Sequence, residues 1–300
     1  MSVSWIVVIN IALRALGRAS PASVATYVPR LATVVIAIGA LSGCASAPMT
    51  KGGSLSSYDR LRPSDGMLAK SLLHIDKEQV MAAQTVRIWP TVFAPGASPQ
   101  LSDEQRRLVA NAIDRTLCAN LSERLRIVGP GEPADLTTYV KVTQAAPTDE
   151  MAAGASKVAS IVPSALGVKV PIPRIPIGLG SLTVEGEAQD ATGRQQAAMV
   201  WARGANSFTN SPKVSAASDP YDLAASFGAD FGQMLVTGAT PFGQPPRLPS
   251  FETLGSSLGG QPKYGACEAF GRGPGLIGMI AGNVGLPPEW SDKGAATNPP

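Results

Sequence analysis

Alternation of apolar and polar residues along the chain predicts a set of short strands. In SLTVEGEAQD, Leu182, Val184 and Ala188 fall on one face of a strand and the polar residues between them fall on the other. RQQAAMVWARG follows as a second strand, and the turn from Asp190 to Gly193 favours a hairpin because glycine tolerates a positive φ. The same criterion predicts further strands at residues 84–90, 126–128 and 135–144.

Two other stretches have the four-residue recurrence of an amphipathic helix. The first covers residues 102–125, where Ser102 and Gln105 make a capping-box pair. Its apolar face consists of Val109, Ile113, Leu117, Leu121 and Leu125. The second begins with Asp219 as the expected N-cap and Pro220 at the first helical position, and it stops at Gly238. Its expected buried face consists of Ala224, Phe227, Phe231, Met234 and Leu235.

This order of elements predicts an α+β fold. The order is β-α-β-β, a spacer, then β-β-α, which fits an antiparallel sheet with two packed helices. We expect the domain to cover residues 80–240, with an apolar, proline-rich insertion at about residues 145–180. A short helix can form early in the insertion, but the prolines of VKVPIPRIPIGLG fix an extended backbone. Residues 241–300, rich in Gly and Pro, are predicted to be an irregular tail lying in a groove, or else a membrane or oligomer contact.

The start of the chain has the character of an export signal. The uncharged run at residues 31–43 follows Arg30 and is too short to span a membrane as a helix, which takes about 20 residues. It ends in the pattern of a bacterial lipobox, which is Leu41, Ser42, Gly43 and Cys44. We therefore predict that residues 1–43 are removed and that Cys44 carries lipid, two or more acyl chains making the attachment stable. The alternative is an uncleaved anchor with an incidental cysteine.

Two features qualify and extend this prediction. The leader is long and holds a second apolar stretch at residues 4–13, which a start codon assigned too far upstream would explain. Ala45 follows the cysteine, where lipoproteins of this kind that stay in the inner membrane carry aspartate, so we expect the periplasmic face of the outer membrane. Residues 44–79 then read as a tether and a segment that docks through Tyr58 and Leu61.

The charge balance argues against binding of nucleic acid. The chain has 25 Lys and Arg residues against 22 Asp and Glu residues. Arg14, Arg18 and Arg30 precede Cys44 and no acidic residue does, so removal of the leader leaves 22 of each sign. No dense basic run and no aromatic platform of the single-strand-binding kind is present in the sequence.

Candidate catalytic and metal-binding residues are sparse. His74 is the one histidine, and a Ser-His-Asp arrangement would also need a serine nucleophile, for which no G-x-S-x-G elbow exists. We expect His74 to be a surface or tether residue. Cys and His are not clustered as zinc sites require, and no phosphate-binding loop motif occurs, so we expect neither a metal nor a cofactor.

Glu185 and Glu187 are the one carboxylate pair worth weighing. They lie two residues apart on one strand face, and glycosidases use two neighbouring carboxylates. That face is the outward face of the predicted hairpin. We therefore expect solvated charges rather than a catalytic pair.

Cys118 and Cys267 are the remaining two thiols. An exported protein meets an oxidising compartment, where an even pair favours a disulfide. A bridge would fix the Gly-rich tail to the domain. The alternative is two unpaired cysteines, one buried in the first helix and one in the tail.

Several phrases together resemble a family of bacterial lipoproteins, the domain of unknown function 3313 family. They are the lipobox, SSYDRLRP, the capped helix after a Trp-Pro strand, LTVEGEAQDATG and DLAASFGADFGQML. The resemblance covers most of residues 44–240. It implies an envelope lipoprotein and no reaction, since the family has no assigned activity.

Three hypotheses about function follow. The first is a non-enzymatic outer-membrane lipoprotein that binds another envelope component through a sheet edge or an apolar loop. The second is an oligomeric or export-channel-like component that places residues 151–180 in or on the bilayer, an analogy of fold only. The third is an enzyme acting on envelope glycan or lipid. The partners that we expect are therefore the membrane, and an envelope protein or a second copy of the chain.

Overall fold

The computed structural model describes residues 47–165, 174, 177–207, 210, 212–244, 254–256, 258–292 and 294–295. The chain divides into two units, Met1–Gly43 and Cys44–Pro300, and every described residue belongs to the second. The predicted signal peptide, Cys44 and most of the proline-rich stretch of the insertion lie outside the described residues.

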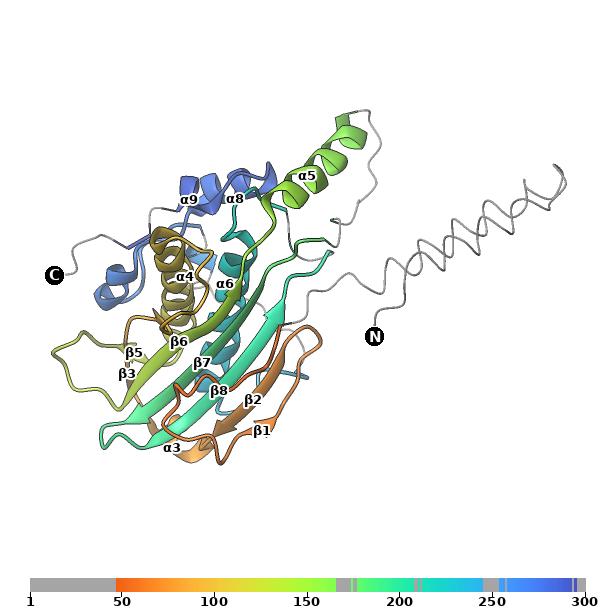
Figure 1. Cartoon of the computed structure of the whole chain (residues 1–300). Coiled ribbons are helices and arrows are strands. Elements are labelled where there is room, and N and C mark those ends of the chain that lie inside the picture. Colours follow the sequence, from red (N-terminus) through yellow and green to blue (C-terminus); the bar gives the residue numbers. More distant parts are fainter. Residues whose placement is uncertain are drawn as a thin grey trace, which may run out of the picture. The chain divides into compact units, whose positions relative to one another are not determined.

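One sheet of eight strands organises the described residues (Figure 1). The order of seven of them is β1-β2-β8-β7-β6-β3-β5, and the remaining strand, β4, also pairs with β6. The strands are β1 (Arg62–Pro63), β2 (Lys70–Ile75), β3 (Thr85–Ile88), β4 (Val92–Phe93), β5 (Arg126–Ile127), β6 (Leu136–Ala146), β7 (Ser181–Asp190) and β8 (Gln195–Gly204). The predicted hairpin, β7 and β8, thus lies at the centre of the sheet.

The pairing is antiparallel over most of the sheet and parallel at one edge. Strands β1, β2, β8, β7 and β6 pair antiparallel in that order, whereas β3 runs parallel to both β5 and β6, and β4 runs parallel to β6. A parallel pair needs a crossover connection, and α4 (Asp103–Leu121) supplies it between β3 and β5. The predicted α+β class with two packed helices is confirmed. The prediction of an antiparallel sheet is wrong at this edge, where the pairs are parallel.

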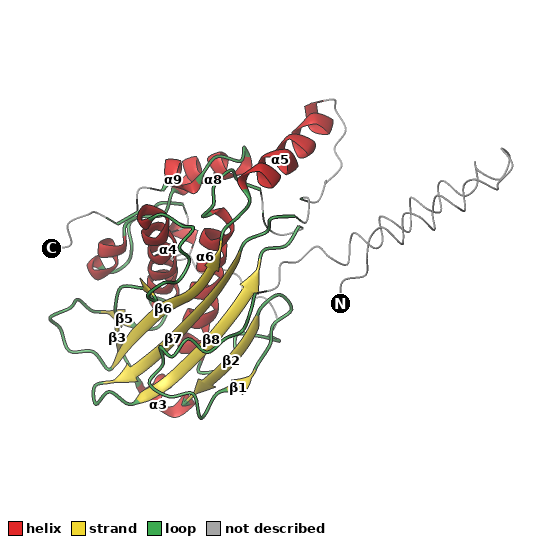
Figure 2. Cartoon of the chain, in the orientation of Figure 1, coloured by secondary structure: helices red, strands yellow, loops and turns green. Residues whose placement is uncertain are grey.

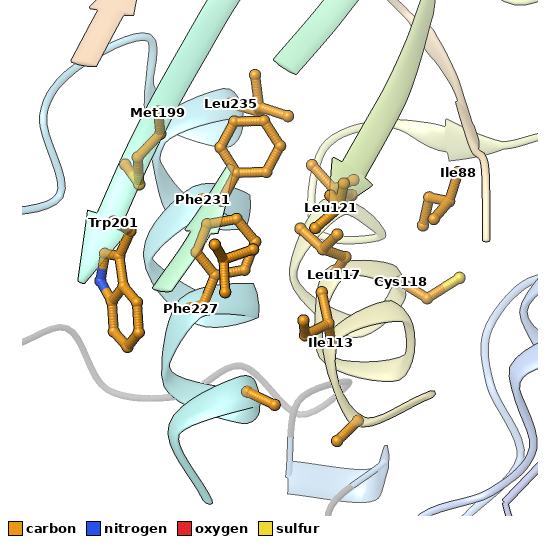
Figure 3. Packing of buried hydrophobic residues seen from close by; sticks show 14 of the residues in the cluster. Ile88, Ile113, Leu117, Cys118, Leu121, Met199, Trp201, Phe227, Phe231 and Leu235 are labelled. Carbon is orange, nitrogen blue, oxygen red and sulfur yellow. The ribbon is translucent and has the colours of Figure 1, made fainter. Parts of the chain in front are cut away.

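Helices α4 and α6 (Ser218–Thr237) cover one face of the sheet (Figure 2). Figure 3 shows the core between them, in which Trp201 of β8 lies edge-on to Phe227 with ring centroids 5.8 Å apart. Phe227 in turn stacks on Phe231, at 5.6 Å. The two helices approach closely because Gly228 has no side chain, and a Cβ there would lie 2.9 Å from the carbonyl oxygen of Ile113.

Both predicted apolar helix faces are buried in this core. Helix α4 begins with the predicted capping box, in which Ser102 accepts from the backbone N–H of Gln105 and Gln105 accepts from the backbone N–H of Ser102. Helix α6 ends at Gly238, whose φ of 64° is the left-handed conformation that glycine adopts without a steric cost. The helix periods and stop signals in the sequence are thus sufficient to place these two elements.

The start of α6 differs from the prediction. Its N-cap is Ala217, and Asp219 lies within the first turn, fully buried. The Asp219 carboxylate accepts from the backbone N–H of Gly180 at 2.8 Å and from Arg174 Nη1 at 2.6 Å. Asp219 therefore joins the helix to the segment before β7 instead of capping the helix.

The domain begins well before residue 80. Strand β2 pairs with β8 along its whole length, and α3 (Lys77–Ala82) follows it. Before β1, Leu55 and Leu61 form a small apolar cluster with Ala198 and Val200 of β8, and Tyr58 packs against it. The segment expected to dock through Tyr58 and Leu61 therefore continues directly into the sheet.

The insertion and the tail both contain helices. Helix α5 (Glu150–Ala165) follows β6. The tail, predicted to be irregular, contains a 3-10 helix η1 (Gly265–Phe270), then α8 (Gly275–Asn283) and α9 (Pro288–Ser291). Buried Asp292 fixes its end, because it pairs with Arg115 of α4 and accepts from the Tyr221 hydroxyl of α6 at 2.6 Å. Within the part of the chain that the structure describes, no helix combines the length and apolarity needed to cross a membrane.

Candidate functional site

A groove opens where β3 and β5 end at the parallel edge of the sheet. Val86 of β3 pairs in parallel with Ile127 of β5, so the carboxyl ends of both strands point the same way. Trp89 and Pro90 follow β3, and Val128 follows β5. Ligands of sheets with parallel strands commonly bind at such carboxyl ends.

The 3-10 helix η1 forms the other wall of this groove. Cys267 of η1 is joined to Cys118 of α4 by a disulfide with a Cα–Cα distance of 5.9 Å. Figure 3 shows Cys118 on the side of α4 that is turned away from α6. The structure thus joins the two cysteines for which the sequence favours a bridge, and the bridge places η1 opposite the ends of β3 and β5.

The groove has a volume of about 570 Å³ and a mainly apolar lining. Its apolar lining includes Ile88, Val128, Pro130, Ala269 and Phe270, and its charged residues are Arg87 and Glu268. We call this site the Trp89 groove. Its size and lining are those of a site that takes an apolar ligand or segment.

Trp89 itself lies on a rim between two hollows. Its side chain is 51% exposed, an unusual exposure for a large aromatic residue. It also lines a second, smaller hollow of about 240 Å³ together with Tyr139, and the two rings are 6.3 Å apart. Exposed aromatic side chains next to a hollow are a common feature of protein-binding surfaces.

Asp114 of α4 holds the loop that carries Trp89. Its buried carboxylate accepts from the backbone N–H of Thr91 at 3.0 Å and from the Thr91 hydroxyl at 2.5 Å. Burial raises the pKa of Asp114 to about 7, against the opposing effect of the Thr91 hydrogen bonds. The rim of the groove is therefore fixed to a core helix.

Glu185 and Glu187 are buried, which corrects the prediction of solvated charges. Their exposures are 1% and 4%. Glu185 accepts from the backbone N–H groups of Gly52 and Ser54, at 2.6 and 2.9 Å, and from the Tyr58 hydroxyl at 2.7 Å. The covering segment lies more than 120 residues away in the sequence, so strand periodicity alone gave no sign of it.

Glu187 binds the same segment two residues further along the chain, at Ser56. It accepts from the backbone N–H of Ser56 at 2.9 Å, from the Ser56 hydroxyl at 2.7 Å and from the Gln195 amide at 2.7 Å. We call residues 48–58, held in this way, the N-terminal clasp. Burial, together with the hydrogen bond and the charge of Glu185, raises the pKa of Tyr58. The two carboxylates thus hold the clasp on the face of the sheet opposite the helices.

His74 lies beside the apolar cluster that the N-terminal clasp covers, and it lines neither hollow. It lies in β2 opposite Ala198 of β8 and is half-buried. Burial and the nearby charge of Arg60 lower its pKa. Its Nε2 atom is buried with no hydrogen-bond partner in the structure. Among the described residues, no group of three or more His, Cys, Asp or Glu side chains could hold a metal ion.

The chain has low sequence identity to several solved structures that resemble it. Two crystal forms of the PelC dodecamer from Paraburkholderia phytofirmans, one of them a point variant, are similar. The variant is 12% identical with a TM-score of 0.32, and the match covers 60% of this chain and 98% of the PelC chain. The other form is 13% identical with a TM-score of 0.31, and the match covers 59% of this chain and 96% of the PelC chain. A DUF4136 family protein from Bacteroides thetaiotaomicron has 10% identity and a TM-score of 0.29 over 61% and 100%. No curated protein matches the chain.

The family model described as "Protein of unknown function (DUF3313)" matches residues 50–231, which run from the N-terminal clasp to the middle of α6. This stretch includes every strand of the sheet and the Trp89 side of the groove. The sequence resemblance is therefore confirmed, and the chain belongs to the DUF3313 family of proteins of unknown function.

Proposed function

We propose that this chain is a non-enzymatic binding module of the cell envelope. In this proposal it is anchored through lipid on Cys44 to the periplasmic side of the outer membrane. The observation that carries the binding role is the Trp89 groove, an apolar hollow at a sheet edge with a half-exposed tryptophan on its rim. The anchor is supported by the lipobox at residues 41–44.

The groove suits an extended apolar segment of another envelope protein. Its walls are two strand ends and η1, so it is open along the sheet edge and not closed around a small molecule. Aromatic side chains and apolar walls supply most of the binding energy at such sites, while a few polar groups fix the register. Arg87 and Glu268 are the charged groups placed to do so.

The groove is tested by a photo-reactive amino acid placed at position 89 in cells. We expect a discrete cross-linked product that is absent when the same amino acid replaces Glu78, an exposed residue of α3 outside the groove. A second variant, Ala269→Trp, would fill the groove from the η1 side and should abolish the product. A product that persists unchanged in the filled variant would show that binding occurs elsewhere.

The anchor is tested by labelling cells with a fatty-acid probe. The unaltered protein should carry the label and fractionate with membranes, and Cys44→Ser should lose the label completely because the acylated atoms are those of this cysteine. An unlabelled protein in both cases would contradict the anchor and leave the groove experiment unaffected.

A second candidate function is an oligomeric, membrane-associated component. It is favoured by the apolar side chains of Met151 and Val158, which α5 exposes within the predicted insertion. Sizing of the purified protein in detergent distinguishes the two functions, since a binding module alone needs no ring or higher assembly.

A further inference from the structure

Helix α8 packs with its small residues inward and its large residues outward. Its buried residues are Gly275 and Ala281, and Gly278 and Gly282 are half-buried. Its large apolar residues, and the capping residue Val284 that follows it, are each more than half exposed; those within the helix are Leu276, Ile277, Met279 and Ile280. A surface helix of a soluble domain buries such side chains against the core. The outward face of α8 is therefore built for a second apolar surface.

Other exposed apolar side chains come from distant parts of the sequence. Met67, in the turn between β1 and β2, is 98% exposed, and Leu68 beside it is partly exposed. Met151 and Val158 are exposed on α5, and Ile177 is exposed shortly before β7. Single exposed apolar residues are ordinary, but a set of them gathered in one place marks an interaction surface.

The sheet register places several of these segments at one end of the strands. Ser181, the first residue of β7, pairs with the last residue of β6, Ala146, and with the last residue of β8, Gly204. Lys70, the first residue of β2, pairs with Ala202 of β8 close by. The β1–β2 turn, the start of α5 and Ile177 therefore share this end of the sheet.

Helix α8 is joined to the same end by hydrogen bonds. Just beyond α8, the carbonyl oxygen of Gly285 accepts from the backbone N–H of Val214 at 3.0 Å. The ammonium group of Lys157 on α5 donates to the carbonyl oxygen of Asn283, the last residue of α8. Figure 1 shows α5 and α8 together beyond the ends of β6 and β7. We call this surface, made of the β1–β2 turn, α5, Ile177 and α8, the apolar end.

The beginning of the described chain lies near the apolar end. The carbonyl oxygen of Pro48 accepts from the hydroxyl of Thr183, the third residue of β7, at 3.0 Å. From there to Cys44 are four residues, which span at most about 14 Å when fully extended. A lipid on Cys44 thus has too short a connection to hold the domain far from the bilayer.

We propose that the apolar end lies on the lipid bilayer, with the outward face of α8 and the exposed side chains of α5 in the interfacial region. This inference rests on the proposed lipid on Cys44. With nine residues α8 is too short to span a membrane, so it lies at the interface, where an apolar helix face enters by about 5–10 Å. We choose the bilayer as the surface that covers the apolar end because only four residues connect the N-terminal clasp to the lipid. This short connection places the apolar end at the membrane surface whether or not a second copy of the chain is present.

The Trp89 groove lies at a distance from the membrane surface in this orientation. The backbone N–H of Trp89 donates to Thr138, which pairs with Ala188 of β7. Ala188 is seven residues from Ser181, or about 23 Å along a strand with 3.3 Å per residue. The groove is therefore held about that far from the membrane surface, and the strands of the sheet run between the membrane and the level of the groove.

A fluorescent probe that responds to polarity tests the orientation in the whole lipoprotein. Ile277→Cys on α8 and Ala191→Cys in the exposed β7–β8 turn each provide one thiol for labelling in the lipidated protein, since Cys118 and Cys267 are bonded to each other and the sulfur of Cys44 carries the lipid. The labelled proteins are reconstituted into vesicles of phosphatidylethanolamine and phosphatidylglycerol. We expect a blue shift, a several-fold rise in emission and quenching by spin-labelled lipid at position 277, and none of these at position 191.

Mass spectrometry of the same preparations reports whether Cys44 carries lipid, so the two proposals fail separately. A lipidated, vesicle-bound protein with no shift at position 277 would overturn the orientation and leave the anchored binding module standing. A protein without lipid on Cys44 would overturn the proposed anchor and, with it, the orientation. A third outcome is a blue shift at position 277 that grows with the amount of protein per vesicle and is not quenched by spin-labelled lipid. This outcome would identify a second copy of the chain as the occupant and overturn the bilayer contact.

Discussion

Replacing Asp219 with alanine is expected to lower the free energy of unfolding by about 3–5 kcal/mol, because it leaves a buried charge without its partner. The Arg174 and Asp219 side chains are 1% and 0% exposed, and their charged atoms are 2.6 Å apart. The change would also leave the backbone N–H of Gly180 without its acceptor. Urea denaturation followed by circular dichroism measures the loss.

Asp103 supplies a matched control for this experiment. It too is an aspartate in the first turn of a helix paired with an arginine, Arg106, but its side chain is 80% exposed. Asp103→Ala should leave the unfolding midpoint close to that of the unaltered protein. Replacing Arg174 and Asp219 together with leucine should recover part of the loss, since no unpaired charge then remains. Equal midpoints for Asp219→Ala and Asp103→Ala would show that the buried pair contributes nothing.

Removing the disulfide by Cys118→Ala together with Cys267→Ala is expected to cost about 2–5 kcal/mol of stability. The bridge closes a sequence separation of 149 residues, and the chain-entropy model gives a value near 5 kcal/mol for a loop of that length. Losing it also removes the covalent link between η1 and α4, so that the η1 wall of the Trp89 groove is held by noncovalent contacts alone. Thermal unfolding with and without a reductant measures the effect on stability.

The double alanine variant serves as the control for the reductant. The reductant should lower the melting temperature of the unaltered protein, and it should leave the melting temperature of the variant unchanged because the variant has no bridge to reduce. The variant should also give less of the cross-linked product from position 89, since η1 is then less firmly held at the groove. If the reductant had no effect on the unaltered protein, the bridge would not be formed in solution or would not stabilise it.

The elements with strong local signals could be predicted from the sequence. The four-residue recurrence and the capping box place α4, and the glycine at position 238 ends α6, because these depend on contacts within a few residues. The β7–β8 hairpin follows from alternation and a turn of suitable residues. The DUF3313 resemblance was visible for the same reason, since it rests on these phrases.

Features that depend on distant pairing could not be predicted. The parallel edge requires β3 to find β5 and β6 across α4, and no local signal distinguishes this from an antiparallel arrangement. The β2 segment, KSLLHI, alternates too little to predict a strand, and its pairing with β8 decides its conformation. Asp219 looked like an N-cap because that residue type favours caps, but a buried arginine far along the chain recruits its carboxylate.

The candidate site was only partly visible in the sequence. Trp89 was assigned to a strand, but its exposure on a rim depends on where η1 lies, and η1 comes from the tail. The possible bridge between Cys118 and Cys267 was the one signal that could have brought η1 to this edge. For Glu185 and Glu187 no signal existed, because an outward strand face reads the same whether water or another segment covers it.

The N-terminal clasp also has a consequence for the sequence of events during folding. Its hydrogen-bonding partners, Glu185, Glu187 and Gln195, follow it by more than 120 residues, so a chain synthesised from its N-terminus has no site for the clasp until the hairpin has been made. Contacts of such long range close late, because the entropy of a large loop must be lost first. A segment that is synthesised before the whole sheet is thus among the last to reach its native position.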